Sequence, residues 1–215
     1  MKEETDGRME LIAVCQKLAE EDLITATDGN VSCRIGEDRV LMTPSGKPKG
    51  ELKPIDLLVL NRHGEVLAGR EKPSGEARMH LEVYSRRADI SAVVHAHPPM
   101  LTAFTLAGIP FMAEALPEVW LMLGPVPTAP YATPSTAEAS EALAPFLEKH
   151  QAILLERHGS LTFGKSLGEA YMRLEKLEHA ARVLFFACLL GKAPPSPLPK
   201  EALEKLQQLA LRLNL

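Results

Sequence analysis

The stretch Val93-Val94-His95-Ala96-His97-Pro98 ends a run of β-branched residues with two histidines in alternate positions. Side chains i and i+2 of a β-strand project from the same face, so His95 and His97 are expected to point the same way. Two imidazoles on one rigid strand form half of a site for a divalent metal ion. The same pair would also suit packed or surface histidines, so further donors must decide between these interpretations.

The composition around this stretch is that of an ordinary globular protein. The chain has 215 residues, 46% of them hydrophobic and 24% charged, which fits one large domain with a sizeable core. A formal net charge of −4 gives no reason to expect binding to nucleic acid or to an anionic membrane. No apolar run approaches the ~18 residues of a membrane span, and the first residues lack the apolar core of a secretion signal. Three isolated cysteines indicate a reducing compartment, so we expect a cytoplasmic protein.

Hydrophobic periodicity predicts an α/β fold, with a largely antiparallel sheet between helices. Ser74 is expected to cap a helix with Glu76 in its first turn, and Ser135 with Glu138 has the spacing of a capping box. Residues 194–199 are a proline-rich linker into an amphipathic helix at 200–213. We therefore expect a single domain over 1–193, with 194–215 as linker and C-terminal helix. The pattern predicts helices at 9–21, 74–87, 98–107, 135–149 and 167–190, and strands at 31–35, 39–42, 57–60, 65–67, 89–97, 152–156 and 160–163.

A third donor for the metal is available at His158. It lies between an apolar strand and Gly159, where a side chain can turn out of the sheet and the glycine leaves room beside it. Three imidazoles with an open position are typical of catalytic zinc, whereas structural zinc closes all four positions. The other histidines are expected in packing or surface roles: His63, His80, His150 and His179.

A metal ion with an open position usually activates a bound molecule, so a base is expected nearby, and Glu76 is the candidate. A carboxylate in the first turn of a helix often only complements the helix dipole. Its neighbours favour a functional role, because three loops offer free amides and short hydroxyls that could form a phosphate nest without any lysine. Each loop alone is more often just a turn. They are Gly29-Asn30, Ser45-Gly46 and Ser74-Gly75.

The order of these motifs resembles the class II aldolase/adducin-head family over roughly residues 8–190, and most closely its L-fuculose-1-phosphate aldolases. The motifs are Thr27-Asp-Gly-Asn30-Val-Ser, Thr43-Pro-Ser-Gly46, Pro73-Ser-Gly-Glu76, His95-Ala-His97-Pro, Ala129-Pro-Tyr-Ala-Thr and His158-Gly159. The resemblance implies a three-layer α/β/α fold with a central antiparallel sheet. It also implies one catalytic Zn²⁺ per subunit, and a C4 homotetramer with active sites at subunit interfaces, on which the C-terminal helix could pack.

Site residues follow from the resemblance position by position. The zinc ligands would be His95, His97 and His158, with Glu76 as the acid/base residue that also ligates the metal before substrate arrives. The phosphate of a small phosphorylated sugar would be held by Thr27, Gly29, Asn30, Ser45, Gly46, Ser74 and Gly75.

Two positions depart from the family pattern. Gly75 stands where the sugar-phosphate aldolase has a second serine, so an amide is kept and a hydroxyl is lost. The family tyrosine that protonates the aldehyde oxygen across the interface has no counterpart in residues 111–120, where Glu114 or Glu118 falls near its place. Either glutamate could be a catalytic proton donor or a plain surface carboxylate. The tail also lacks the family's aromatic residue.

The function implied is reversible cleavage of a ketose 1-phosphate of the L-fuculose 1-phosphate type. The products would be dihydroxyacetone phosphate and lactaldehyde, formed through a metal-stabilised enediolate. Glu76 is expected to have a raised pKa for its role as base, since burial and the negative charge of the substrate phosphate would disfavour its ionised form. Dehydration of methylthioribulose 1-phosphate and 4-epimerisation of ribulose 5-phosphate use the same chemistry and remain alternatives, as does a non-catalytic interaction module like the adducin head.

Overall fold

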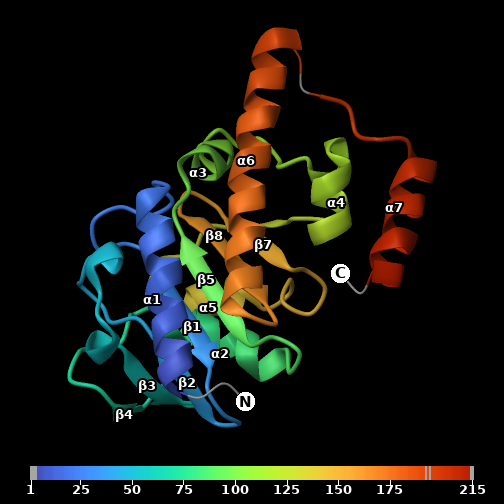
Figure 1. The fold of residues 1–215 in the computed structure, drawn as a ribbon. Coiled ribbons are helices and arrows are strands. Elements are labelled where there is room, and N and C mark those ends of the chain that lie inside the picture. Colours follow the sequence, from blue (N-terminus) through green and yellow to red (C-terminus); the bar gives the residue numbers. More distant parts are fainter. Residues whose placement is uncertain (1–3, 192, 194, 214–215) are drawn as a thin grey trace.

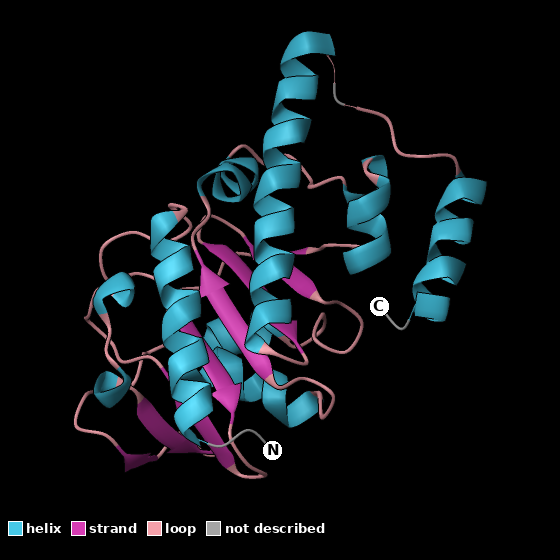
Figure 2. Cartoon of the chain, viewed as in Figure 1, coloured by secondary structure: helices cyan, strands magenta, loops and turns pink. Residues whose placement is uncertain are grey.

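The computed structural model describes residues 4–191, 193 and 195–213, and it shows a sheet between two layers of helices (Figures 1 and 2). The strand order is β4-β3-β2-β1-β5-β8-β7-β6, and every neighbouring pair is antiparallel except β6 with β7. The expected α/β fold with a largely antiparallel central sheet is confirmed. The strands are β1 (Asn30–Arg34), β2 (Arg39–Met42), β3 (Leu58–Asn61), β4 (Val66–Ala68), β5 (Ala92–Ala96), β6 (Thr128–Ala129), β7 (Ala152–Leu155) and β8 (Gly159–Gly164).

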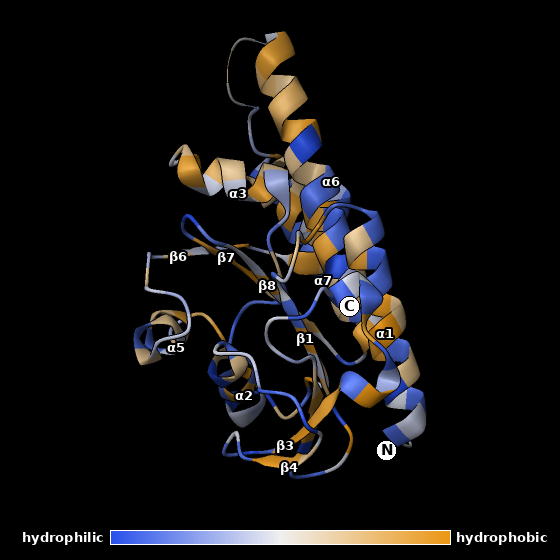
Figure 3. Ribbon diagram, turned by 90° about the vertical axis from the view of Figure 1, so that its left-hand side faces the viewer, coloured by the Kyte–Doolittle hydropathy of each residue, from blue (hydrophilic) through white to orange (hydrophobic). Residues whose placement is uncertain are grey.

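Helices cover both faces of the sheet. On one face, α1, α3, α4 and α6 enclose the larger core, and on the other α2 and α5 enclose a second core (Figure 3). Alternate residues of β5 divide between the two, since Val94 packs into the first core and Val93 into the second. His95 therefore shares the face of Val93, toward α2. The helices are α1 (Glu4–Glu20), α2 (Ala77–Arg86), α3 (Pro99–Leu106), α4 (Pro117–Leu123), α5 (Ala137–Leu143), α6 (Leu167–Gly191) and α7 (Lys200–Leu213).

Two predicted helix starts are wrong. Helix α2 begins at Ala77, and Glu76 is its N-cap residue rather than part of the first turn. The Ser74 hydroxyl instead accepts a hydrogen bond of 3.2 Å from the Glu76 amide, which closes a turn ahead of the helix. Helix α5 is shorter than predicted, and Thr136, not Ser135, is its N-cap residue. Ahead of α5 the Thr136 hydroxyl donates to the Thr133 carbonyl at 2.6 Å, so here too a side chain stabilises the preceding turn.

The segment around His97 and the start of α3 is held by hydrogen bonds to residues far away in the sequence. Strand β5 ends at Ala96, one residue short of the predicted end at His97. The His97 amide donates instead to the Leu23 carbonyl at 3.0 Å. Helix α3 then begins, and its first amides, Met100 and Leu101, donate to the buried carboxylate of Glu178 on α6 at 3.1 and 3.0 Å. A buried carboxylate at a helix N-terminus satisfies amides that have no partner within the helix.

The far end of α6 extends beyond the sheet, as Figures 1 and 3 show. Its buried stripe ends at Leu184, and Cys188 one turn further on is only half-buried. Beyond this point large apolar side chains are exposed, including Phe186 at 58% and Leu190 at 86%.

The C-terminal helix α7 packs beside α4, where the Trp120 indole donates to the Leu203 carbonyl at 3.2 Å. The start of the predicted linker, Pro194, lies outside the described residues, and the division of the chain at that point stays a prediction. Across the described helices, none is long and apolar enough to cross a membrane.

Candidate metal centre

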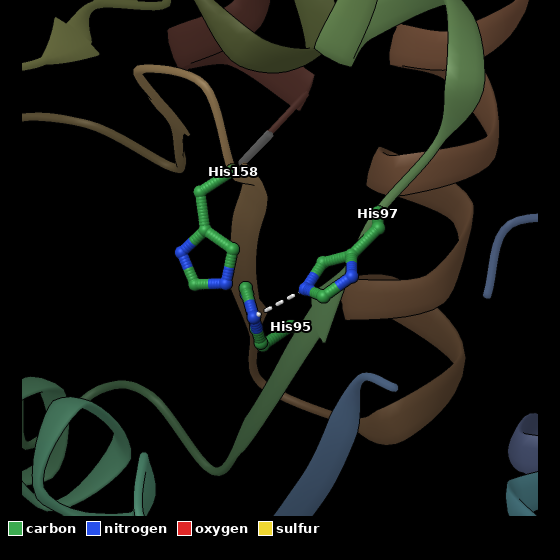
Figure 4. A group of neighbouring side chains, drawn as sticks. All are labelled: His95, His97 and His158. Carbon is green, nitrogen blue, oxygen red and sulfur yellow. Dashed lines mark hydrogen bonds between the residues drawn. The ribbon is translucent and has the colours of Figure 1, made fainter. Parts of the chain in front are cut away.

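Three imidazole rings meet on the α2 side of the sheet (Figure 4). His95 comes from β5, His97 directly follows that strand, and His158 belongs to the turn between β7 and β8. The ring centroids are 4.8 to 4.9 Å apart, and one nitrogen of each ring lies within 4.8 Å of the others. The structure therefore brings together the three histidines that the sequence singled out.

Strand pairing fixes the position of His95 at the base of the group. Its neighbours across the ladders are Asn30 on β1 and Leu161 on β8. Nδ1 of this fully buried ring lies 3.0 Å from the Ser160 carbonyl oxygen, to which it donates when Nε2 is the free nitrogen. That contact leaves Nε2 facing the other two histidines, since it lies 3.0 Å from Nε2 of His97.

Gly159 allows His158 to approach. A Cβ at this position would run into the backbone carbonyl of Ala96 and would lie 2.8 Å from Cδ2 of His97. The chain turns there through Arg157, whose φ of +60° is in the left-handed region. A residue without a side chain is thus required at position 159, because the backbone of β5 and the ring of His97 approach it closely.

Asp28 orients the second histidine. Its Oδ2 lies 3.5 Å from Nδ1 of His97, on the opposite side of the ring from the nitrogen that faces His95. A carboxylate behind a ligating imidazole is the usual means of fixing its tautomer and raising its basicity. Nothing in the sequence pattern distinguished Asp28 from an ordinary turn residue before Gly29.

Glu76 completes the ring of donors. Its Oε2 lies 3.3 Å from Nε2 of His95, and its Oε1 lies 3.3 Å from Nε2 of His158. The side-chain amide of Asn30 donates to Oε2 at 2.7 Å. The carboxylate thus stands where a fourth ligand would stand, held by a neutral donor from β1.

The pKa of Glu76 is lower than its ordinary value, contrary to expectation. Burial acts to raise this pKa, but the hydrogen bond and charge of His95, together with the amide of Asn30, outweigh it. The carboxyl group is therefore ionised in the free chain.

For His97 and His158, by contrast, the lowered pKa favours the neutral ring. Burial, reinforced by the charge of His95, lowers the pKa of His158 to about 4 and also lowers that of His97. Neutral imidazoles are the form that binds metal.

The donor set fits a divalent ion. Nitrogens bound at about 2.1 Å to one tetrahedral ion lie roughly 3.4 Å apart, close to the spacing of 3.0 Å between the Nε2 atoms of His95 and His97. Three imidazoles and one carboxylate suit zinc and several other transition metals. His95, His97, His158 and Glu76 are accordingly the residues that could hold the metal.

A cavity of about 300 Å³ opens directly beside these donors. Glu76, His97 and His158 form one part of its wall. The rest of the wall contains every residue predicted to hold a phosphate: Thr27, Gly29, Asn30, Ser45, Gly46, Ser74 and Gly75. The structure therefore brings the three glycine loops together, while their role in binding phosphate stays a prediction.

The cavity also contains a lysine, in addition to the glycine loops singled out from the sequence. Lys49 lines the cavity and is only 2% exposed, with Nζ donating to the carbonyls of Thr27 at 2.7 Å and Lys47 at 2.9 Å. Burial lowers the pKa of this ammonium group. No local pattern marked Lys49, since it reaches the cavity only through the path of the loop after Gly46.

The two remaining candidates lie elsewhere in the chain. Glu118, in the first turn of α4, lines a groove beside Lys176 and His179 on the α6 side of the sheet. Glu114 is half-buried in a short 3-10 helix, Ala113–Ala115, whose carbonyl at residue 114 accepts a hydrogen bond from Leu198. Within the described chain neither carboxylate is part of the cavity wall beside the histidines.

Comparison with known families gives this site its context. A model of the class II aldolase and adducin N-terminal domain matches residues 9–185. The chain belongs to this family. Class II aldolases are metal-dependent, and members act on small phosphorylated sugars.

Individual relatives of this class II aldolase-family chain carry different activities in their names. A 5-deoxy-D-ribulose 1-phosphate aldolase of Bacillus thuringiensis serovar kurstaki is 34% identical over 201 residues, covering 93% of this chain and 92% of the relative. A 3-oxo-tetronate 4-phosphate decarboxylase of Escherichia coli K12 is 33% identical over 197 residues, covering 90% and 91%. A solved L-fuculose 1-phosphate aldolase is 32% identical with a TM-score of 0.88, covering 98% of this chain and 97% of that one.

These comparisons identify the protein as an enzyme, a metal-dependent lyase of the class II aldolase type. They favour catalysis over the non-catalytic module that the sequence left open. The names differ in substrate, so the family defines the class of chemistry and not the molecule that is cleaved.

Proposed function

We propose that this class II aldolase-family enzyme reversibly cleaves a ketose 1-phosphate of the L-fuculose 1-phosphate type into dihydroxyacetone phosphate and lactaldehyde. The observation that carries the proposal is the cavity in which Glu76, His97 and His158 face the three glycine loops. The cavity thus offers a charged proton acceptor, a metal site and an anion cradle to one small substrate. We propose Zn²⁺ as the ion, one per subunit, because three imidazoles with a further open position are typical of catalytic zinc.

The chain's own residues divide the work. The metal, when bound, supplies a Lewis acid that stabilises the enediolate of the substrate. Amides and hydroxyls of the glycine loops hold the phosphate, with the ammonium group of Lys49 adding positive charge at the wall. The carboxylate of Glu76 transfers the proton at carbon. In the condensation direction it removes a proton from dihydroxyacetone phosphate, and in the cleavage direction it returns that proton to the enediolate.

The lowered pKa of Glu76 suits the first of these steps. An ionised carboxylate is ready to accept a proton without prior loss of its own. The Asn30 amide holds Oε2, so we propose Oε1, which lies 3.3 Å from Nε2 of His158, as the atom that takes the proton. Asn30 is therefore proposed to position the base as well as to line the phosphate cradle.

The aldehyde half of the site is proposed to come from a neighbouring subunit. Glu114 and Glu118 do not line the cavity of their own chain, so either could act as proton donor only across an interface. The exposed apolar end of α6 favours such an interface, since large contiguous apolar surfaces of this kind are usually covered in an assembly. We accordingly propose the homotetramer that the family resemblance implies.

An assay with defined substrates tests the activity. Zinc-loaded enzyme is given L-fuculose 1-phosphate, 5-deoxyribulose 1-phosphate or 3-oxo-tetronate 4-phosphate, and dihydroxyacetone phosphate and carbon dioxide are measured. Release of dihydroxyacetone phosphate from L-fuculose 1-phosphate supports the proposal. Release from 5-deoxyribulose 1-phosphate alone would keep the aldol cleavage but replace lactaldehyde by acetaldehyde as the second product. Carbon dioxide from the third substrate alone would establish decarboxylation instead, the second candidate, which the names of relatives 33% identical to this chain favour. Methylthioribulose 1-phosphate and ribulose 5-phosphate complete the panel for the dehydratase and epimerase alternatives.

A further inference from the structure

Gly75 and Ser135 meet at the wall of the phosphate cavity. A Cβ added at Gly75 would lie 2.5 Å from Oγ of Ser135 and 2.7 Å from its Cβ, closer than such atoms can approach. The space that a side chain at position 75 would need is therefore already filled. The group that fills it is itself a serine hydroxymethyl group, presented by the loop between β6 and α5.

Both residues belong to the same cavity. Ser135 lines it together with Ser45 and Lys49, in the segment after β2, and with Ser74, ahead of α2. The loop of Ser135 was identified from sequence only as the start of a helix, so no function had been attributed to it. Its position in the wall places one more hydroxyl among the amides and hydroxyls of the glycine loops.

The local structure gives Ser135 no other evident task. Thr136, not Ser135, is the N-cap residue of α5, and no side-chain cap bond is formed there. Within the described chain the Ser135 hydroxyl makes no hydrogen bond to protein, so its bonding capacity is available to a ligand. Its backbone has a φ of +64°, a left-handed conformation that costs a non-glycine residue free energy. Such strain persists where the surrounding structure imposes it, often at ligand sites.

We propose that Ser135 donates a hydrogen bond to the substrate phosphate, in place of the hydroxyl that is lost because residue 75 is glycine. The proposal rests on the proposed function, since it assumes that the cavity holds a phosphate. It follows that the two positions are alternatives. One hydroxyl fits at this point of the wall, carried either by residue 75 or by residue 135, but not by both.

A swap of the two side chains tests this proposal. Binding of inorganic phosphate to the zinc-loaded protein is measured by calorimetry for Ser135→Ala, Gly75→Ser and the double variant Gly75→Ser/Ser135→Gly. Ser135→Ala should weaken binding roughly tenfold or more, the range for one hydrogen bond to a charged group. Gly75→Ser alone should also weaken it, because the two side chains collide. The double variant should return affinity to within about threefold of the unchanged protein, since glycine tolerates the backbone at 135.

Ser45→Ala is the reference, because Ser45 lies in the cradle already proposed. If Ser45→Ala weakens phosphate binding and Ser135→Ala does not, the assignment of Ser135 is wrong while the proposed function stands. Failure of the double variant to recover affinity would also overturn it, since Ser135 would then serve only the shape of the loop. If neither Ser45→Ala nor Ser135→Ala weakens phosphate binding, or if the unchanged protein binds no phosphate, the proposed phosphate cradle is wrong and the assignment of Ser135 fails with it. Thermal melting and zinc content of each variant show that the fold is intact.

Discussion

The side-chain amide of Asn30 donates a hydrogen bond of 2.7 Å to Oε2 of Glu76, a residue 46 positions away in the chain. Asn30 is buried on β1 directly beside His95, and Glu76 precedes α2 on the same face of the sheet. One contact thus ties the proposed base to the strand ladder that carries the first metal donor. A bond to the ionised carboxylate stabilises that form, which is one reason why the pKa of Glu76 is low.

Replacement of Glu76 by glutamine should separate catalysis from metal binding. Glu76→Gln keeps the size of the side chain and its bond from Asn30, but it removes the proton acceptor. We expect turnover to fall by roughly 10²- to 10⁴-fold while zinc remains bound. Steady-state rates and metal analysis check this, with Glu82→Gln as the matched control, because Glu82 lies on α2 and pairs with Arg86 at the surface. A fully active Glu76→Gln protein would show that the base lies elsewhere.

Loss of the charge behind His97 should weaken metal binding without removing a ligand. Asp28→Asn leaves the three imidazoles in place but takes away the carboxylate 3.5 Å from Nδ1 of His97. Zinc affinity is expected to drop about 10- to 100-fold, the usual effect of losing such a partner. Competition with a chromophoric chelator measures this. Asp22→Asn, an exposed change in the preceding turn, should leave the affinity unchanged.

The lysine of the cavity should matter for phosphate. Lys49→Met removes the ammonium group at the wall, and we expect the affinity for inorganic phosphate to fall about tenfold or more. Lys47→Met is the matched control two residues away, since Lys47 pairs with Asp56 at 2.7 Å and Glu71 at 2.8 Å and does not line the cavity. Equal effects of the two changes would mean that only the net charge of the region matters.

Stability should depend on pH through His80. Burial lowers the pKa of this ring to about 3, and the charge of His95 adds to the shift. As the pH falls, His80 is therefore protonated in the unfolded chain at a higher pH than in the folded chain. The free energy of unfolding should therefore be fully retained above pH ~6.5 and fall as the pH drops toward 3, by up to about 1.4 kcal/mol per pH unit. Urea titrations across this window should give a shallower slope for His80→Gln, which can keep a bond to Ser32. The exposed His63→Gln should have the slope of the unchanged protein.

The assembly should depend on the end of α6. Phe186→Asp places a charge on an apolar surface that is 58% exposed in the single chain. If this surface joins subunits, light scattering after gel filtration should show a tetramer for the unchanged protein and smaller species for the variant. Val183→Ala on the same helix is a mild control. A tetramer that survives Phe186→Asp would place the interface on another surface.

The group of three histidines could be predicted from sequence because its signals are local. His95 and His97 alternate at a strand end, and His158 stands before a glycine that a tight approach of strands requires. The α/β class followed from the alternation of helical and strand patterns in the same way. These features depend on neighbours within a few residues, which periodicity captures.

The rest of the site depends on how distant loops pack. Lys49 and Ser135 reach the cavity through loop paths that only the folded sheet defines. The pKa of Glu76 was expected to be raised by burial and by the charge of a bound phosphate. In the chain itself His95 and Asn30, placed by the β1–β5 pairing, outweigh the burial and lower this pKa. The helix starts at Ser74 and Ser135 were misplaced because their turns compete with capping geometry.

The antiparallel ladder β1–β5–β8 has a consequence for how the protein is handled. It gathers donors that are far apart in the unfolded chain, since His95 and the carbonyl that orients it are 65 residues apart. An ion bound by this set therefore binds the native state and hardly the unfolded one, so an excess of metal raises the free energy of unfolding. A hundredfold excess over the dissociation constant adds about 2.7 kcal/mol. Melting temperature should then track free zinc, and purification in a chelating buffer would yield a protein that is less resistant to heat and proteases.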